Sequence, residues 1–195
     1  MISRISKTIA YQLFSPTESQ GYLDIYAYSI ECLFGELVID LLLLVIGIVF
    51  HRVAYIIIWT IVFTMFRVAI GGYHASSHFC CTFFTCLLAC MAIILNHYIA
   101  HLSLFWLVLI QMICLMSVFY LAPVIHPNHP LAIKTIERTR IYARCLISCE
   151  VFVFFIDYYS FRKFCYILIS AVCISIILAW IGWGTTIFSK IEEQR

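Results

Sequence analysis

The sequence predicts an all-α, polytopic helical membrane protein, and three observations lead to that fold class. The 195 residues are 64% hydrophobic and only 11% charged, whereas soluble domains are about half apolar and roughly a quarter charged. The apolar residues form continuous runs such as LLLLVIGIVF, without the alternation that the strands of a membrane barrel require. A helix satisfies its backbone hydrogen bonds internally, as a segment in lipid must. A soluble domain and a β-barrel are therefore excluded.

The first 21 residues are expected to lie at the membrane surface. Apolar residues recur there at helical spacing: Ile2, Ile5, Ile9 and Leu13. Arg4 and Lys7 fall elsewhere on the helical wheel. This pattern is typical of a basic amphipathic helix on an anionic leaflet, and a plain solvated cap is the alternative. We expect a single integral membrane domain, 1–195, in which 1–21 is interfacial and 22–195 forms the helical bundle.

Six apolar segments follow the N-terminal helix. They cover about 23–50, 53–66, 79–96, 102–121, 141–157 and 164–188. A helix needs about 20 residues to cross a bilayer, so the second segment is short: it is a tilted or partial span, or it extends through the Ile70–Gly72 region. We expect six transmembrane segments. The alternative has four, with the second and third segments re-entrant.

The basic residues predict which side of the membrane is cytoplasmic. If both termini and the loops 67–78 and 122–140 share one side, that side holds nine of the 12 Lys and Arg residues, counting Arg144 just inside the fifth segment beside them. These are Arg4, Lys7, Arg67, Lys134, Arg138, Arg140, Arg144, Lys190 and Arg195. The opposite side holds Arg52, Arg162 and Lys163. Cytoplasmic loops carry the excess of positive charge, so both termini are expected inside. A net charge of +2 is too small to imply nucleic-acid binding.

Most of the 10 cysteines lie inside apolar runs, where a thiol acts as a small hydrophobe. These are Cys32, Cys86, Cys90, Cys114, Cys145, Cys149, Cys165 and Cys173. Only Cys80 and Cys81 lie beside a polar turn. Neither a disulfide framework nor a CxxC zinc pattern is visible in the spacing.

The segment FRVAIGGYHASSHFCCTFF places polar and reactive residues between two apolar runs. Gly71 and Gly72 allow backbone conformations that are barred to other residues. Ser76 or Ser77 can cap a new helix that begins near His78. The segment is therefore expected to turn after the glycines and start a helix at the membrane edge.

His74 and Cys81 could cooperate in that arrangement. On one uninterrupted helix they would lie about 10 Å apart along the axis, too far to exchange a proton. With the break, His74 lies on a turn that can fold back toward Cys81 in the first turn of the next helix. A helix N-terminus and a nearby imidazolium both stabilise a thiolate. This is one way to build a cysteine nucleophile with a histidine base.

Two other interpretations of the segment stay open. One is a polar loop in which the thiols are structural. The other is a metal site, in which His74 and His78, spaced i, i+4, join Cys80 or Cys81 as ligands.

The run Arg67–x3–Gly71-Gly72-Tyr73-His74-Ala75–x5–Cys81 resembles the signature of the accessory gene regulator B family, bacterial membrane endopeptidases that process quorum-sensing propeptides. The stretch LAPVIHPNHPL, residues 121–131, is similar to the family's Ala-Pro-rich cytoplasmic loop. Where a lysine is expected before the final proline, this chain has His129. Length, amphipathic N-terminus and number of apolar segments agree over the whole chain.

The resemblance implies a catalytic pair, Cys81 as nucleophile and His74 as base, with Arg67, Gly71 and Gly72 as supporting or substrate-binding residues. The implied reaction cleaves an AgrD-like autoinducer propeptide at its C-terminal side through a thioester. A cysteine or serine of the peptide then closes a thiolactone or lactone ring. The resemblance also implies a homodimer in the bacterial cell membrane, an active site on the cytoplasmic side, and no cofactor or metal.

Acidic residues inside the apolar segments have no assigned role. They are Glu31, Glu36, Asp40 and Glu150. Acids at membrane depth are costly and indicate function, and Glu36 and Asp40, spaced i, i+4, share a helix face. Three roles stay open for this pair: orienting His74, pairing with Arg67 or Arg144, or contacting a second protomer.

Two other classes of function also fit the sequence. Acids within membrane segments and a six-span layout are typical of a small transporter or exporter. His74, His78 and the adjacent cysteines would fit a metal-binding or redox membrane protein. The basic tract from Lys134 to Arg144 is a positive-inside anchor or a site for an acidic tail of the propeptide.

Overall fold

A computed structural model describes residues 2–14, 20–72, 78–124 and 133–193, and within these ranges the chain consists of helices, the turns between them and one isolated bridge. The helices are α1 (Ile2–Phe14), α2 (Gln20–Val49), α3 (Val53–Ile70), α4 (His78–Ile99), α5 (Leu104–Leu121), α6 (Ile133–Ser160) and α7 (Cys165–Glu193). The predicted all-α class is confirmed, and a helix stands where the N-terminal amphipathic helix was expected.

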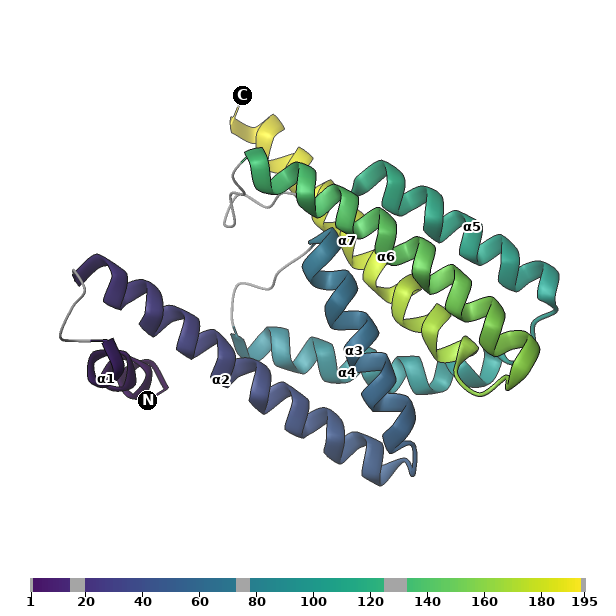
Figure 1. The fold of residues 1–195 in the computed structure, drawn as a ribbon, viewed down its shortest axis with the longest axis horizontal. Coiled ribbons are helices and arrows are strands. Elements are labelled where there is room, and N and C mark those ends of the chain that lie inside the picture. Colours follow the sequence, from purple (N-terminus) through teal and green to yellow (C-terminus); the bar gives the residue numbers. More distant parts are fainter. Residues whose placement is uncertain (1, 15–19, 73–77, 125–132, 194–195) are drawn as a thin grey trace.

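The helices α2–α7 run alternately from one side of the bundle to the other (Figure 1). α5, α6 and α7 contact one another, α3 and α4 pack against α7, and α2 packs against α3 and α4. α1 packs against α2, at the edge of the molecule away from α5 (Figure 1). Because α7 packs against α3, α4, α5 and α6, it is the central helix of the bundle. The α1–α2 pair is peripheral.

Five helices are long and apolar enough to cross a membrane among the residues that the structure describes. They are the spans Leu23–Val49, Val53–Ile70, Cys80–Ile99, Leu104–Leu121 and Cys165–Ile187. The segments proposed as re-entrant in the four-span alternative are parts of continuous helices of 18 and 22 residues. α3 reaches Ile70, as the extended version of the second segment predicts.

The predicted fifth span, 141–157, lies in α6 but is not among these five, because its charged side chains lower its apolar character. Two of these charges are satisfied inside the bundle. The Gln111 amide donates hydrogen bonds to both carboxylate oxygens of Glu150, at 3.0 and 2.8 Å. The backbone N–H groups of Phe164 and Cys165 each donate to Asp157 at 2.8 Å. α6 has 28 residues, about 42 Å of helix, and it lies beside α5 and α7 (Figure 1).

The core is built around α7 and divides into three clusters. One joins α3, α5, α6 and α7 through residues such as Phe66, Val118 and Ile147. A second joins α2, α3, α4 and α7 around Trp59, and a third lies at the other end of α5 and α6 around Phe154. Small side chains on α7, Ala171 and Ala179 among them, are fully buried and let neighbouring helices approach closely.

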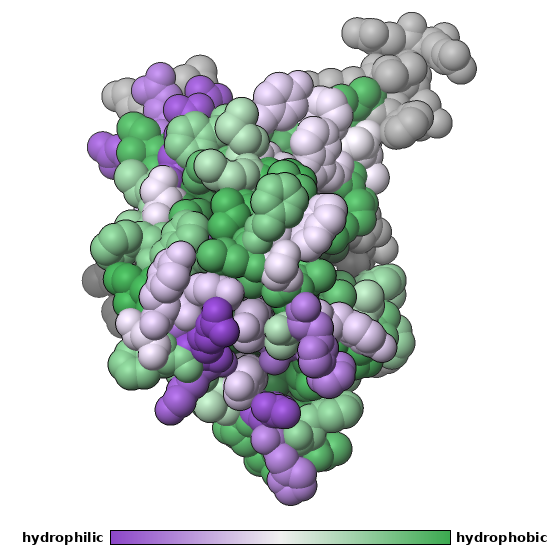
Figure 2. Space-filling model, turned by 90° about the vertical axis from the view of Figure 1, so that its right-hand side faces the viewer, coloured by the Kyte–Doolittle hydropathy of each residue, from purple (hydrophilic) through white to green (hydrophobic). Residues whose placement is uncertain are grey.

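The outer surface is also hydrophobic, which a soluble protein avoids. Figure 2 shows hydrophobic side chains over much of one face, with groups of hydrophilic side chains at its upper left and in its lower third. Large apolar side chains face outward on several helices, for example Val68 at 73% exposure, Phe105 at 70% and Phe152 at 67%. The chain is therefore a membrane-embedded protein whose outward-facing surface carries many large apolar side chains.

Candidate active site

The end of α3 is shaped by two consecutive glycines. Gly71 has φ 76° and Gly72 has φ 129°, a region that L side chains rarely adopt. A Cβ on Gly71 would lie 2.5 Å from the carbonyl oxygen of Val124, and one on Gly72 would lie 2.7 Å from Nη1 of Arg67 and 2.9 Å from the carbonyl oxygen of Leu178. Both positions need glycine for conformation and for space. The predicted break after α3 is confirmed.

The segment after α5 is tied to this turn. The N–H of Val124 donates to the carbonyl oxygen of Ile70 at 2.7 Å, and Gly71 and Val124 form an isolated parallel bridge. Val124 follows the cis peptide bond between Ala122 and Pro123. The two stretches that carry the family resemblance, one around Gly71 and one beginning at Leu121, therefore meet at the same end of the bundle.

Arg67 lies in the last turn of α3 and connects three helices. Its Nη1 donates a hydrogen bond to the carbonyl oxygen of Gly71 at 3.3 Å, and its own carbonyl oxygen accepts from the N–H of Gly71 at 3.0 Å. The guanidinium also interacts electrostatically with Cys81 of α4 and Glu36 of α2. Because a guanidinium keeps its proton in proteins, a permanent positive charge lies within electrostatic range of Cys81.

Cys81 is the fourth residue of α4, which begins at His78 as the sequence predicts. Its side chain is partly exposed, and its carbonyl oxygen accepts a hydrogen bond from the Thr85 hydroxyl at 2.9 Å. Cys80 is more exposed, and one residue along a helix turns the side chain by about 100°. Of the two adjacent thiols, the one near Arg67 is that of Cys81.

His74, the predicted base, lies outside the described residues, as do the predicted capping serines Ser76 and Ser77 and the loop residue His129. The structure brings Arg67, Gly71, Gly72 and Cys81 together and leaves the position of His74 a prediction. Among the residues that the structure describes, no group of three or more His, Cys, Asp and Glu side chains is arranged to hold a metal ion. The alternative metal site includes His74, so it is not tested.

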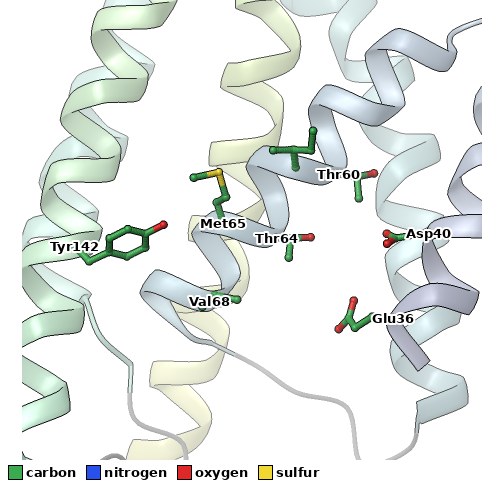
Figure 3. A pocket seen from close by; sticks show the side chains of 8 residues that line it. Glu36, Asp40, Thr60, Thr64, Met65, Val68 and Tyr142 are labelled. Atoms are coloured by element: carbon green, nitrogen blue, oxygen red, sulfur yellow. The ribbon is translucent and has the colours of Figure 1, made fainter. Parts of the chain in front are cut away.

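The acids of α2 border an open groove. Glu36 and Asp40 line it together with Thr60, Thr64 and three apolar side chains of α3, and with Tyr142 of α6 (Figure 3). The groove has a volume of about 590 Å³. Three roles were left open for this pair. The structure supports pairing with Arg67, because Glu36 interacts electrostatically with it.

Glu150 has a structural partner that the sequence analysis missed. Gln111 is 1% exposed and Glu150 7%, and their hydrogen bonds join α5 to α6 within the bundle. The sequence does mark Gln111 as unusual, since it is the one polar amide in the apolar run LFWLVLIQMICLM. Its partner could not be read from the sequence, because 39 residues separate the two side chains.

The comparisons with known proteins agree with the motif. A family model described as Accessory gene regulator B matches residues 3–181, which include α1 through most of α7. No curated protein and no solved structure matches the chain.

Proposed function

Because the chain belongs to the accessory gene regulator B family, and so to the proteins that process quorum-sensing propeptides, we propose that it is a membrane cysteine endopeptidase with Cys81 as its nucleophile. The observation that carries this proposal is the position of Cys81 in the first turn of α4, within electrostatic range of Arg67. A helix N-terminus and a neighbouring cation both favour the thiolate, which is the reactive form of cysteine.

The first half of the reaction is acyl transfer to Cys81. His74 takes the proton from the Cys81 thiol, and the thiolate attacks the scissile carbonyl of the propeptide. When the C–N bond breaks, His74 returns the proton to the leaving amine, so the C-terminal fragment departs as a neutral amine. The N-terminal fragment stays attached to Cys81 as a thioester.

The second half closes the ring. A cysteine or serine of the peptide attacks the thioester and gives up its proton through His74, which regenerates the Cys81 thiol. Exchange of one thioester for another leaves the number of thioester bonds unchanged, so this step needs no ATP. It does need water to be kept away from the thioester, and the apolar surroundings of α3 and α4 support that exclusion.

Negative charge develops on the carbonyl oxygen in both halves. The backbone N–H groups of the first turn of α4, which have no partner within the helix, can donate to this oxygen, as can the guanidinium of Arg67. Gly71 and Gly72 act indirectly, since their turn fixes the Gly71 carbonyl to which Arg67 donates.

We place the active site on the cytoplasmic side of the bacterial cell membrane, where nine of the 12 basic residues are expected, and we propose that the protein acts as a homodimer on an AgrD-like propeptide. The positive-inside rule supports the orientation. The proposal of a homodimer is supported by membership of the family alone.

The test is propeptide cleavage by the full chain in membranes, using the peptide encoded by the neighbouring reading frame. Cys81→Ala should abolish cleavage, because no other thiol shares its position beside Arg67. Cys80→Ala is the matched control and should cleave at close to the rate of the parent chain. If Cys81→Ala still cleaves, or if Cys80→Ala does not, the assignment of the nucleophile is wrong.

A further inference from the structure

The groove beside α3 is a continuous feature that starts at the active-site end. Its floor is the outward face of α3, where Ile61, Met65 and Val68 follow one another at helical spacing and are 54%, 39% and 73% exposed. Glu36 lines the groove and interacts electrostatically with Arg67, and the stripe from Val68 to Ile61 is about 10 Å long. The groove therefore leads from the neighbourhood of Arg67 into the membrane.

The two edges of the groove differ in chemistry. In Figure 3 the carboxylates of Glu36 and Asp40 project from α2 toward the side of α3 that bears Thr60 and Thr64, whereas the ring of Tyr142 projects from α6 on the opposite side. One edge is thus acidic with hydroxyl groups beside it, the floor is apolar, and the other edge is aromatic.

The acidic edge lies deep in the membrane. At 1.5 Å per residue, Asp40 and Glu36 are about 14 and 20 Å from the end of α2 at Val49, within a hydrocarbon layer that is about 30 Å thick. Both side chains are exposed, and a carboxylate facing lipid at that depth is costly. A cationic group that enters the groove would remove this cost, at least in part, so the site is electrostatically complementary to a positively charged helix.

We propose that this groove binds a helical segment of the propeptide that carries a Lys or Arg side chain. The segment lies along α3 with its apolar side on Ile61, Met65 and Val68 and its basic side chain against Asp40 and Glu36. This inference rests on the proposed function, since it makes the groove the place where the substrate is held while its scissile bond lies at Cys81. Recognition of this kind is the helix-in-groove mode, with anchors at i, i+4 and i+7.

The position of the groove favours the substrate over a second copy of the chain as the occupant. A peptide that leaves the groove beside Glu36 arrives near Arg67, with which Glu36 interacts electrostatically, whereas a second copy in the groove would block this route. Among the described residues of this chain, Arg67 in the last turn of α3 and Arg144 in α6 are also engaged: Arg67 with Gly71, and Arg144 with the carbonyl oxygen and ring of Phe119.

A photo-crosslinking experiment tests the location. The full chain carrying Cys81→Ala, which leaves the propeptide uncleaved, is made with p-benzoylphenylalanine at position 61 and an epitope-tagged propeptide is co-expressed. Irradiation should give a chain–propeptide adduct. Position 113 on α5 is the matched control, because Ile113 is 58% exposed against 54% for Ile61, and it should give no such adduct. An adduct between two copies at position 61, or equal propeptide adducts at both positions, overturns the proposal.

A charge-reversal experiment tests the chemistry in the cleavage-competent chain. Asp40→Lys should raise KM for the propeptide about 10- to 100-fold, because a favourable charge contact becomes repulsive, and should leave kcat within about twofold. Asp24→Lys makes the same change on the exposed start of the same helix and should leave both constants unchanged. When the basic residue of the peptide is replaced by Glu, the KM of the Asp40→Lys chain for this peptide should return to close to that of the parent chain for the parent peptide. Unchanged KM in Asp40→Lys, or no restoration by any such peptide, overturns the proposal.

The two proposals fail separately. If cleavage depends on Cys81, but position 61 gives no propeptide adduct and Asp40→Lys leaves KM unchanged, the groove assignment is wrong and the assignment as a peptidase remains. If cleavage is independent of Cys81, the peptidase assignment fails, and the crosslinks at position 61 still report whether the peptide occupies the groove.

Discussion

Gly72 occupies the closest approach between the turn after α3 and the central helix. Its missing side chain leaves room for Nη1 of Arg67 on one side and for the carbonyl oxygen of Leu178 in α7 on the other. A side chain here would displace the guanidinium that lies near Cys81. The residue thus links backbone conformation to the electrostatics of the active site.

Gly72→Ala should therefore damage both stability and cleavage. The φ of 129° adds about 1–3 kcal/mol of backbone strain for alanine, and a displaced Arg67 should slow cleavage by up to about 100-fold. Thermal unfolding in detergent and the rate of propeptide cleavage measure the two effects. Gly184→Ala is the control: a Cβ at Gly184 in α7 meets nothing within 4 Å. Equal behaviour of the two variants would refute the role given to Gly72.

The sequence predicted part of the site for local reasons. Two glycines followed by serines predict a break and a new helix, and α4 does begin at His78, with Cys81 in its first turn. The contact between Arg67 and the Gly71 carbonyl depends on the path of the chain after α3, which propensities do not specify. The proximity of Glu36 depends on how α2 packs against α3, a long-range property.

Helix α6 contains two acidic side chains, Glu150 and Asp157, whose hydrogen bonds are made inside the bundle. Gln111 of α5 donates to both oxygens of Glu150 of α6, and both side chains are buried. A buried polar pair contributes little net stability, but removing one partner leaves the other unsatisfied. The pair therefore fixes the register of α6 against α5.

Glu150→Ala should destabilise the protein by about 1–2 kcal/mol. Glu150→Gln keeps a hydrogen-bond acceptor and the shape of the side chain, so it should destabilise the protein less than Glu150→Ala. The double variant Gln111→Leu with Glu150→Leu removes both polar groups and should recover most of the loss. Thermal unfolding in one detergent compares the three. If the double variant is less stable than Glu150→Ala, the pair does more than satisfy its own hydrogen bonds.

Helix boundaries were predicted best where glycine, proline or serine marks a turn. The second segment was predicted to end at 66 or to extend, and α3 continues to Ile70 because Val68, Ala69 and Ile70 are apolar and no glycine or proline interrupts the helix before Gly71. α6 was harder, since Arg144, Glu150 and Asp157 lie within its apolar half. Their hydrogen-bond partners come from neighbouring helices and from the turn before α7, so the sequence pattern alone could not predict how they are accommodated.

At the scale of the whole molecule, the alternating directions of α2–α7 predict that the two termini lie on the same side of the membrane (Figure 1). This holds only if α6 crosses together with the five helices of higher apolar character. The turn between α6 and α7, which contains Arg162 and Lys163, would then face outward.

Reporter fusions measure this topology. Alkaline phosphatase inserted after Lys163 should be active, because it folds only outside the cytoplasm, and green fluorescent protein at the C-terminus should fluoresce. A phosphatase fused at the C-terminus is the control and should be inactive. An active phosphatase at the C-terminus would mean an odd number of crossings and would exclude α6 as a span.

The central position of α7 has a consequence for biosynthesis. Its contacts with α3, α4, α5 and α6 supply the common packing partner of those helices, yet it leaves the ribosome after all of them. At about 5–20 residues per second, the synthesis from the end of α3 to the end of α7 takes about 6–25 s, and α3 waits in the membrane for that time without its partner. We therefore expect nascent chains that stall before α7 to be substrates for membrane quality-control proteases, and messages truncated before the codons of α7 to yield no stable product.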